Sequence, residues 1–161
     1  MKPAVILLGS NMGNRFHNLE SAQEKLMLCF GQVQLQSLIY KTAPWGNTNQ
    51  DDFLNKVIVV NSDKDAFEIL KILLTIEVEI GRTRTGKWAS RTIDLDLLYL
   101  GNEIIDTKSL RVPHPHIQDR KFTLIPLCEI LPDFIHPLFQ LSNKELLLQT
   151  TDKSDVYIYE H

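Results

Sequence analysis

The sequence predicts an α+β fold built from a strand, a helix, two strands, a second helix and a further strand, in that order. Residues 4–8 form a continuous apolar run, which is typical of a central strand buried on both faces. Segments 16–30 and 67–80 carry apolar residues at a period near 3.6, and a glycine follows each of them. Residues 92–100 alternate in side-chain type over their first half, which indicates a strand.

The segments between these elements complete the order. Residues 32–40 and 53–60 are predicted strands, and a polar loop over 41–52 separates them. Asp63 or Asp65 can cap the helix that follows, because a side-chain oxygen there accepts from the first free amides of a helix.

The last third of the chain adds elements to this core. A turn at 101–102 predicts a hairpin into a strand at 103–105. A loop then extends to a short helix with Pro126 in its first turn, and a last helix opens at a capping box formed by Ser142 and Glu145. The arrangement is a ferredoxin-like βαββαβ core with an added hairpin strand and C-terminal helices.

Length and composition limit the classes of protein that fit. The 161 residues are 43% hydrophobic and 23% charged, which suits a single domain over 1–161 with its own core. The net charge of −3 predicts no general attraction to nucleic acid or to anionic lipid. The run at 4–8 is too short for a signal peptide or membrane span, so we expect a cytoplasmic protein, and a monomer by default. Cys29 and Cys128 are predicted to be buried free thiols.

Asp94 and Asp96 are the first candidate for chemistry. They are two residues apart in a strand, so both carboxylates lie on one face with their Cα atoms roughly 6.6 Å apart. Two like charges so placed cost stability unless a cation lies between them. Oxygen ligands favour Mg²⁺, which takes one or two carboxylates and completes its shell with water and phosphate. The alternative is a structural pair neutralised by Arg91 or Lys87.

A basic loop precedes these acids. Between Arg82 and Arg91 there are four basic residues and no acid, and Arg supplies the planar donors that phosphoryl transfer requires. A second basic segment, 111–121, contains His114 and Arg120. No Walker-type phosphate loop or protein-kinase signature is present, so another kind of phosphate site is predicted.

Aromatic residues lie close to these motifs in the chain. Trp45 and Trp88 fall in predicted loops, where they either fold onto the core or seal a closed site against water. Phe53 and Asn55 share one face of their strand, and Phe122 follows the second basic segment. An amide beside an aromatic face suits a flat, hydrogen-bonding heterocycle, although each phenylalanine also fits a core position.

Residues 87–98 closely resemble the signature of 6-hydroxymethyl-7,8-dihydropterin pyrophosphokinase, an enzyme of folate biosynthesis. The resemblance extends over nearly the whole chain, through further matching segments in the same order: 9–13, 42–44 with 46, 52–55, 76–77 with 81–82, 101–103, 112–114, 119–122 and 126–127. It implies transfer of the pyrophosphoryl group of ATP to the pterin hydroxymethyl oxygen, with release of AMP.

The resemblance also implies a role for each matching residue. Asp94 and Asp96 would hold two Mg²⁺ ions, and Arg82 and Arg91 would neutralise the transferred group. ATP would contact a set of mostly basic and aromatic side chains: Glu77, Arg84, Trp88, Arg91, His114 and Arg120. The pterin would contact a second set: Thr42, Ala43, Trp45, Phe53, Asn55 and Phe122.

Three positions depart from the family's usual pattern. Phe53 replaces a Tyr, Leu74 replaces a Gln on the adenine side, and Ser109 replaces an Arg.

Two other functions would also use these residues. A palm-like Mg²⁺-dependent nucleotidyltransferase would use the same paired acids, but the net charge of −3 does not favour the binding of a nucleic-acid template. A non-catalytic ligand-sensing module would leave the basic loop and the aromatic residues unexplained.

Overall fold

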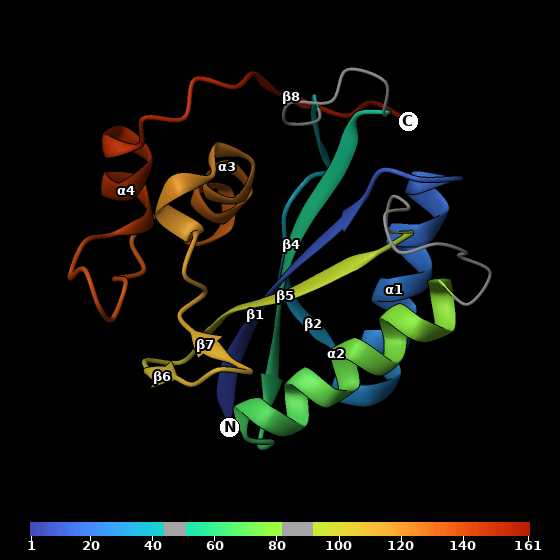
Figure 1. Ribbon diagram of the computed structural model, residues 1–161, viewed down its shortest axis with the longest axis horizontal. Helices are drawn as coiled ribbons and strands as arrows, with labels where there is room; N and C mark the ends of the chain where they lie inside the picture. The colour runs from blue at the N-terminus through green and yellow to red at the C-terminus, as the bar shows by residue number, and fades with distance from the viewer. Residues whose placement is uncertain (44–50, 82–91) are drawn as a thin grey trace.

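The computed structural model describes residues 1–43, 51–81 and 92–161 (Figure 1). Its strands are β1 (Lys2–Ser10), β2 (Val33–Gln36), β3 (Tyr40–Thr42), β4 (Phe53–Ser62), β5 (Asp94–Leu100), β6 (Ile105–Asp106), β7 (Arg111–Val112) and β8 (Val156–Ile158). Its helices are α1 (Arg15–Phe30), α2 (Ala66–Gly81), α3 (Lys121–Ile130) and α4 (Asn143–Gln149), with one 3₁₀ turn, η1 (Ile117–Asp119).

The main sheet is antiparallel and has the strand order β5-β1-β4-β3-β8, with β2 also paired to β4. The two long central strands, β1 and β4, are flanked by β5 on one side and by β2 and β3 on the other. This is the order that a ferredoxin-like βαββαβ chain produces. The predicted fold class is therefore confirmed.

Helices cover both faces of the sheet, α1 and α2 on one and α3 and α4 on the other (Figure 1). Ile6 and Leu8 of β1 belong to the core cluster that contains residues of α1 and α2. Val5 and Leu7 belong to the second cluster, with residues of α3 and α4. Because successive side chains of a strand point to opposite faces, β1 needs apolar residues at every position, and this explains its unbroken apolar run.

Side-chain caps define the helix ends. Asn14 accepts the amide of His17 at 3.1 Å at the start of α1, and the chain leaves that helix at Gly31 with φ of 83°. Asp65 accepts the amide of Glu68 at 2.9 Å at the start of α2, as predicted. Ser142 and Glu145 form both bonds of the predicted capping box of α4.

The segment predicted as one strand over 32–40 is divided into β2 and β3. At the break, the Ser37 hydroxyl accepts the Val57 amide at 3.0 Å and donates to the Leu38 carbonyl at 2.7 Å. A side chain thus takes the place of the backbone in the ladder at this point, so the strand is interrupted although both of its halves pair with β4.

Three features near the C-terminus differ from expectation. After the turn at 101–102, β6 pairs with β7 rather than with β5, so the added hairpin forms its own small sheet. Pro126 lies in the second turn of α3, because that helix already starts at Lys121, whose amide donates to Asp152 at 2.8 Å. The strand β8 was not predicted, since it exists only through its pairing with β3.

Both cysteines are free, but Cys29 is exposed and Cys128 half-buried, so the prediction of burial is wrong for Cys29. Leu26 of α1 turns into the core instead.

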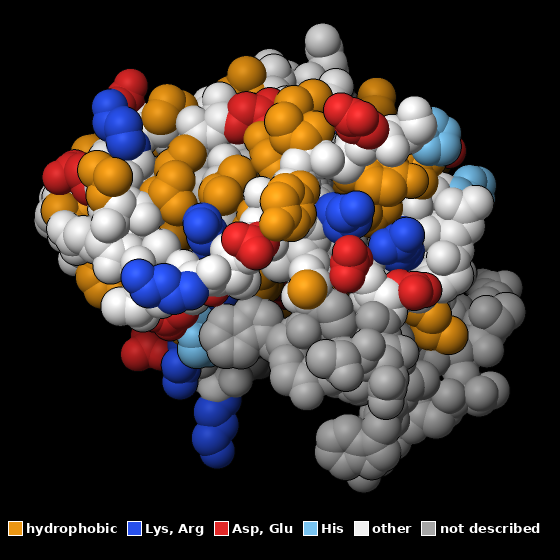
Figure 2. Space-filling view, turned by 90° about the horizontal axis from the view of Figure 1, so that it is seen from above, with side chains coloured by type: hydrophobic (Ala, Val, Ile, Leu, Met, Phe, Trp, Pro, Cys, Tyr) orange, Lys and Arg blue, Asp and Glu red, His pale blue; other side chains and the backbone are white. Residues whose placement is uncertain are grey.

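In the described parts of the chain, no helix is long and apolar enough to cross a membrane. On the face shown in Figure 2, acidic and basic side chains are interspersed with apolar ones.

Candidate active site

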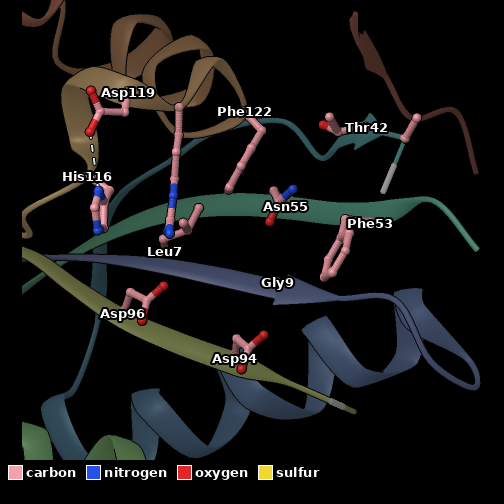
Figure 3. A pocket seen from close by; sticks show the side chains of 12 residues that line it. Leu7, Gly9, Thr42, Phe53, Asn55, Asp94, Asp96, His116, Asp119 and Phe122 are labelled. Carbon is pink, nitrogen blue, oxygen red and sulfur yellow. Dashed lines mark hydrogen bonds and ion pairs between the residues drawn. The ribbon is translucent and has the colours of Figure 1, made fainter. Parts of the chain in front are cut away.

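The two acids of β5 point into one cavity, as strand alternation predicts. Asp94 and Asp96 are half-exposed, whereas Leu95 and Leu97 between and after them are buried in the core. Both carboxylates line a cavity of about 520 Å³ on the α3 side of the sheet (Figure 3). The paired acids therefore face a space that can receive a ligand.

Residues from six elements line this cavity. Eight of the predicted site residues are among them: Thr42, Ala43, Phe53, Asn55, Asp94, Asp96, Arg120 and Phe122. Four lining residues were not predicted: Leu7, Gly9, His116 and Asp119. The structure thus brings the predicted pterin residues and the predicted metal ligands together, although they are up to 80 positions apart in the chain (from residue 42 to residue 122).

The middle of the cavity floor is a row of three residues on adjacent strands. Gly9 of β1 pairs with Asp94 of β5 on one side and with Asn55 of β4 on the other. A Cβ atom on Gly9 would lie 2.7 Å from the Asn55 side-chain oxygen, closer than such atoms come in proteins. The glycine therefore leaves room for the Asn55 amide, which is buried within the cavity wall.

One end of the cavity is aromatic and offers hydrogen bonds. Phe53 and Phe122 approach it from β4 and α3, and Asn55 and Thr42 lie near them (Figure 3). Thr42 is 2% exposed, and its hydroxyl oxygen has no hydrogen-bond partner among the described residues. A buried hydroxyl is costly without a partner, so this end suits a flat ligand with polar edges.

The other end of the cavity carries basic and titratable side chains. The Arg120 guanidinium lies 5.8 Å from the centre of the Phe122 ring, and so joins the aromatic end to this one. His116 and Asp119 form a pair, with Nδ1 and a carboxylate oxygen 3.2 Å apart. Arg120 and His116 are the donors that an anionic ligand would meet here.

His114 lies beside this end without lining the cavity. Its backbone amide donates to the Leu98 carbonyl at 2.9 Å, and its Nδ1 accepts the His116 amide at 3.1 Å. Burial, with smaller contributions from the charges of Arg120 and His116, lowers the pKa of His114 to about 4. The ring is therefore neutral near pH 7, with its proton on Nε2.

Glu77 supports the strand that carries the acids. Its carboxylate accepts the Leu95 amide at 2.7 Å, so α2 is joined to β5 at the residue between Asp94 and Asp96. A second link lies at the same end of the strand, where Asn18 bonds to Ser10 and to the Thr92 carbonyl. These contacts hold the backbone of the segment that carries Asp94 and Asp96, and so they position the two carboxylates.

The donor set fits Mg²⁺ when a ligand supplies further oxygens. Among the described residues no group of three or more His, Cys, Asp or Glu side chains is arranged to hold a metal ion. A pair of carboxylates open to a cavity matches Mg²⁺, which keeps water and binds phosphate oxygens in its remaining positions. Zinc prefers nitrogen and sulfur ligands in a closed site, which this pair does not provide.

Comparison with known proteins decides the family. The sequence model of the 7,8-dihydro-6-hydroxymethylpterin-pyrophosphokinase (HPPK) family matches residues 5–132. The chain belongs to this family. It is a pyrophosphokinase, a transferase of folate biosynthesis, and the predicted resemblance is confirmed.

Relatives of the same name extend over nearly the whole chain. The 2-amino-4-hydroxy-6-hydroxymethyldihydropteridine pyrophosphokinase of Aquifex aeolicus is 39% identical over 146 residues, which cover 91% of each chain. The enzyme of that name from Bacillus subtilis is 38% identical over 158 residues, covering 98% of this chain and 90% of the relative.

A solved structure shares the fold. Plasmodium falciparum HPPK-DHPS, wild type with pteroate, superposes on 92% of this chain with a TM-score of 0.73 at 15% identity. This chain spans 42% of that longer one, and at such an identity the likeness concerns the fold alone.

Five of the residues predicted for this pyrophosphokinase's site lie outside the described residues: Trp45, Arg82, Arg84, Trp88 and Arg91. The residues that sequence reasoning missed had only weak signals. His116 and Asp119 lie within the basic segment from which His114 and Arg120 were chosen, and Gly9 ends the first apolar run. Which residues of the basic segment reach the cavity depends on the packing of η1 and α3 over the sheet.

Proposed function

We propose that this pyrophosphokinase transfers the β,γ-pyrophosphoryl group of ATP to the hydroxymethyl oxygen of 6-hydroxymethyl-7,8-dihydropterin and releases AMP. The observation that carries the proposal is that a single cavity contains the paired acids Asp94 and Asp96 at its floor and the aromatic pair Phe53 and Phe122 at one end. A heterocycle bound at the aromatic end would bring a side-chain hydroxyl toward the carboxylates.

The pterin is assigned to the aromatic end. Phe53 and Phe122 would stack on its two faces, and Asn55 would read its edge through a side chain that can both donate and accept. The unpartnered Thr42 hydroxyl offers one further bond, and we assign backbone groups near Ala43 and Trp45 to the same edge. These contacts would orient the hydroxymethyl group for attack.

Asp94 and Asp96 are assigned to two Mg²⁺ ions. Their fit rests on the shared face, on their partial exposure in the cavity, and on the oxygen-only donor set. Bound Mg²⁺ would neutralise phosphate charge and polarise the phosphoryl group. The contact of Glu77 with Leu95 would keep the two carboxylates in place during turnover.

The nucleotide phosphates are assigned to the basic end. Arg120 would donate to them from the start of α3, with Glu77, Arg84, Trp88 and His114 proposed around the nucleotide. Arg82 and Arg91 are proposed to neutralise the charge that develops on the transferred group. In the reaction, the pterin oxygen bonds to the β-phosphorus and loses its proton, while the bond from that phosphorus to the oxygen of AMP breaks.

The wider expectations for the chain are also proposals. The two core clusters lie on the two faces of one sheet, which supports a single domain over 1–161. The two free thiols support a reducing location, the cytoplasm, where ATP is also present. We propose a monomer that acts on small molecules and does not bind nucleic acid or membrane.

The test is the identity of the nucleotide product. The protein is incubated with ATP, MgCl₂ and 6-hydroxymethyl-7,8-dihydropterin, and the nucleotides are separated by chromatography. We expect AMP, formed only when the pterin is present. ADP, free pyrophosphate or no turnover would contradict the proposal.

A variant locates the reaction in this cavity. Asp96→Asn keeps the size of the side chain and removes its charge, so turnover should fall by about a hundredfold or more while the unfolding curve changes little. The matched control is Asp133→Asn, a largely exposed aspartate 3.2 Å from Lys144 at the surface, which should keep normal turnover. Equal activity of the two variants would show that Asp96 is not a metal ligand.

A further inference from the structure

The pair formed by His116 and Asp119 is not among the residues that the proposed function assigns to ATP or to the pterin. His116 is half-exposed at the side chain, 53%, and lines the cavity that contains the paired acids. Its Nδ1 lies 3.2 Å from the Asp119 carboxylate, which also lines the cavity. A carboxylate on one ring nitrogen holds a proton there and orients the ring, so the chemistry available to a ligand lies at Nε2.

The pair occupies the end of the cavity opposite the aromatic one. In Figure 3, His116 and Asp119 lie beyond Asp96, whereas Phe53 and Thr42 lie at the far end. The hydrogen bond to Asp119 leaves the opposite side of the ring turned toward the strands of the cavity floor (Figure 3). A chain of phosphates that passed the two acids would arrive at this ring.

The charged and titratable groups around His116 come from four parts of the chain. Asp119 of η1 is its direct partner, Asp96 of β5 and Arg120 at the start of α3 line the same cavity, and His114 lies in the preceding loop. The rings of His114 and His116 have their centres 5.9 Å apart. Burial lowers the pKa of His114, so its ring is neutral near pH 7, and its Nδ1 accepts the His116 amide. Of the two histidines, His116 is the one that lines the cavity.

We propose that His116, oriented by Asp119, is a phosphate-contacting residue of this site and donates from Nε2 to the nucleotide's phosphoryl oxygens. This rests on the proposed function, because it assumes that the phosphates of ATP occupy the basic end of the cavity. When the ring carries both protons, Nδ1–H bonds to Asp119 and Nε2–H is free for the ligand. When it loses one, Nε2 becomes an acceptor and repels phosphate oxygen.

The consequence is a contact that contributes to the affinity for ATP and not to the affinity for the pterin. Loss of one hydrogen bond to a charged group lowers affinity by about tenfold. The affinity for the pterin should not change, because Phe53 and Asn55 lie at the other end of the cavity.

The experiment compares four variants of the full chain at one pH near neutrality. His116→Gln removes the imidazole, His116→Arg supplies a permanent cation that also donates to phosphate, and Asp119→Ala leaves the ring without its partner. The control is His17→Gln, because His17 is an exposed histidine of α1 whose Nε2 lies 3.4 Å from the Ser21 hydroxyl. KM for ATP and KM for the pterin are measured separately, and binding of a non-hydrolysable ATP analogue is measured by calorimetry.

We expect His116→Gln to raise KM for ATP about tenfold. His116→Arg should keep an affinity for ATP close to that of the wild type, because a guanidinium also donates to phosphate, and Asp119→Ala should weaken ATP binding. KM for the pterin should be unchanged throughout, a separation that a merely structural role would not produce. The control should match the wild type for both substrates.

Two results would overturn the inference. An unchanged KM for ATP in His116→Gln, when the wild-type enzyme makes AMP normally, contradicts the role of His116 and leaves the proposed function standing. A wild type that makes no AMP contradicts the proposed function, and the inference with it.

Discussion

Gly9 shows how one residue without a side chain shapes the floor of the site. It lies between Asp94 and Asn55 on three adjacent strands, and its hydrogen-bonding register places all three in one row. Any Cβ atom there would meet the Asn55 side-chain oxygen at 2.7 Å. The position therefore decides whether the Asn55 amide can keep its orientation toward the pterin end.

The substitution Gly9→Ala should raise KM for the pterin about tenfold, because the new methyl group pushes the Asn55 amide away and one hydrogen bond to the ligand is lost. KM for ATP should change much less. The measurement is steady-state kinetics with each substrate varied in turn.

Gly81→Ala is the matched control for that variant. Its Cβ would have ordinary contacts with Thr92, at 3.9 Å, and its backbone is not in the left-handed region. A pterin KM that is equally raised in both variants, or raised in neither, would show that Gly9 does not act through Asn55.

At the scale of elements, the site depends on how β1, α1 and the start of β5 are joined. Asn18 of α1 donates from its side-chain nitrogen to the Ser10 hydroxyl at 3.1 Å, to the Met12 carbonyl at 2.9 Å and to the Thr92 carbonyl at 3.3 Å. Ser10 donates to the same Thr92 carbonyl at 2.6 Å. One buried amide thus holds the end of β1 beside the residues that lead into Asp94.

Removal of this link by Asn18→Ala should lower the free energy of unfolding by about 1–3 kcal/mol, because the buried Ser10 hydroxyl and the Met12 carbonyl lose their donor. Urea denaturation followed by circular dichroism measures the change. Gln23→Ala, on the same helix, removes a surface bond to Gln36 and should cost within about 0.5 kcal/mol. Similar losses in both variants would contradict a special role for Asn18.

At the scale of the whole molecule, a buried histidine links stability to pH. His136 is 1% exposed, and its Nδ1 accepts the amides of Leu138 at 3.2 Å and Phe139 at 3.3 Å. Its proton is therefore on Nε2, and its ring lies edge-on to the Tyr99 ring with the two ring centres 5.6 Å apart. Burial lowers the pKa of His136 to about 4, because a charged ring would lose its contact with water and with both amides.

The sign of the pH effect follows from this lowered pKa. In the unfolded chain the histidine pKa is about 6.5, so between pH 6.5 and about 4 only the unfolded state binds the proton. The free energy of unfolding should fall by about 1–3 kcal/mol as the pH is lowered through this window, and this group should cause no further loss below it.

His136→Asn should flatten this part of the stability profile, because the Asn oxygen can still accept both amides but does not titrate. Urea unfolding at pH 7.0, 5.5 and 4.5 measures the slope. The exposed His17→Asn should keep the slope of the wild type. An equally steep profile in His136→Asn would show that His136 does not carry the acid sensitivity.

Much of the fold could be predicted because its signals are local. Alternation in β5, the apolar run in β1 and the caps at Asp65 and Ser142 each depend on residues close together in the chain. The strand β8 and the early start of α3 at Lys121 could not be predicted in this way. Both depend on partners more than 30 positions away, β3 for one and Asp152 for the other.

The sequence by itself determined that Asp94 and Asp96 share a face beside basic and aromatic residues, because the two-residue period of a strand and the order of motifs are properties of the chain. Only the tertiary structure decided that Gly9 makes room for Asn55, and that His116 rather than His114 lines the cavity. Those facts depend on strand register and on how η1 packs over the sheet, and neither is encoded in any short segment.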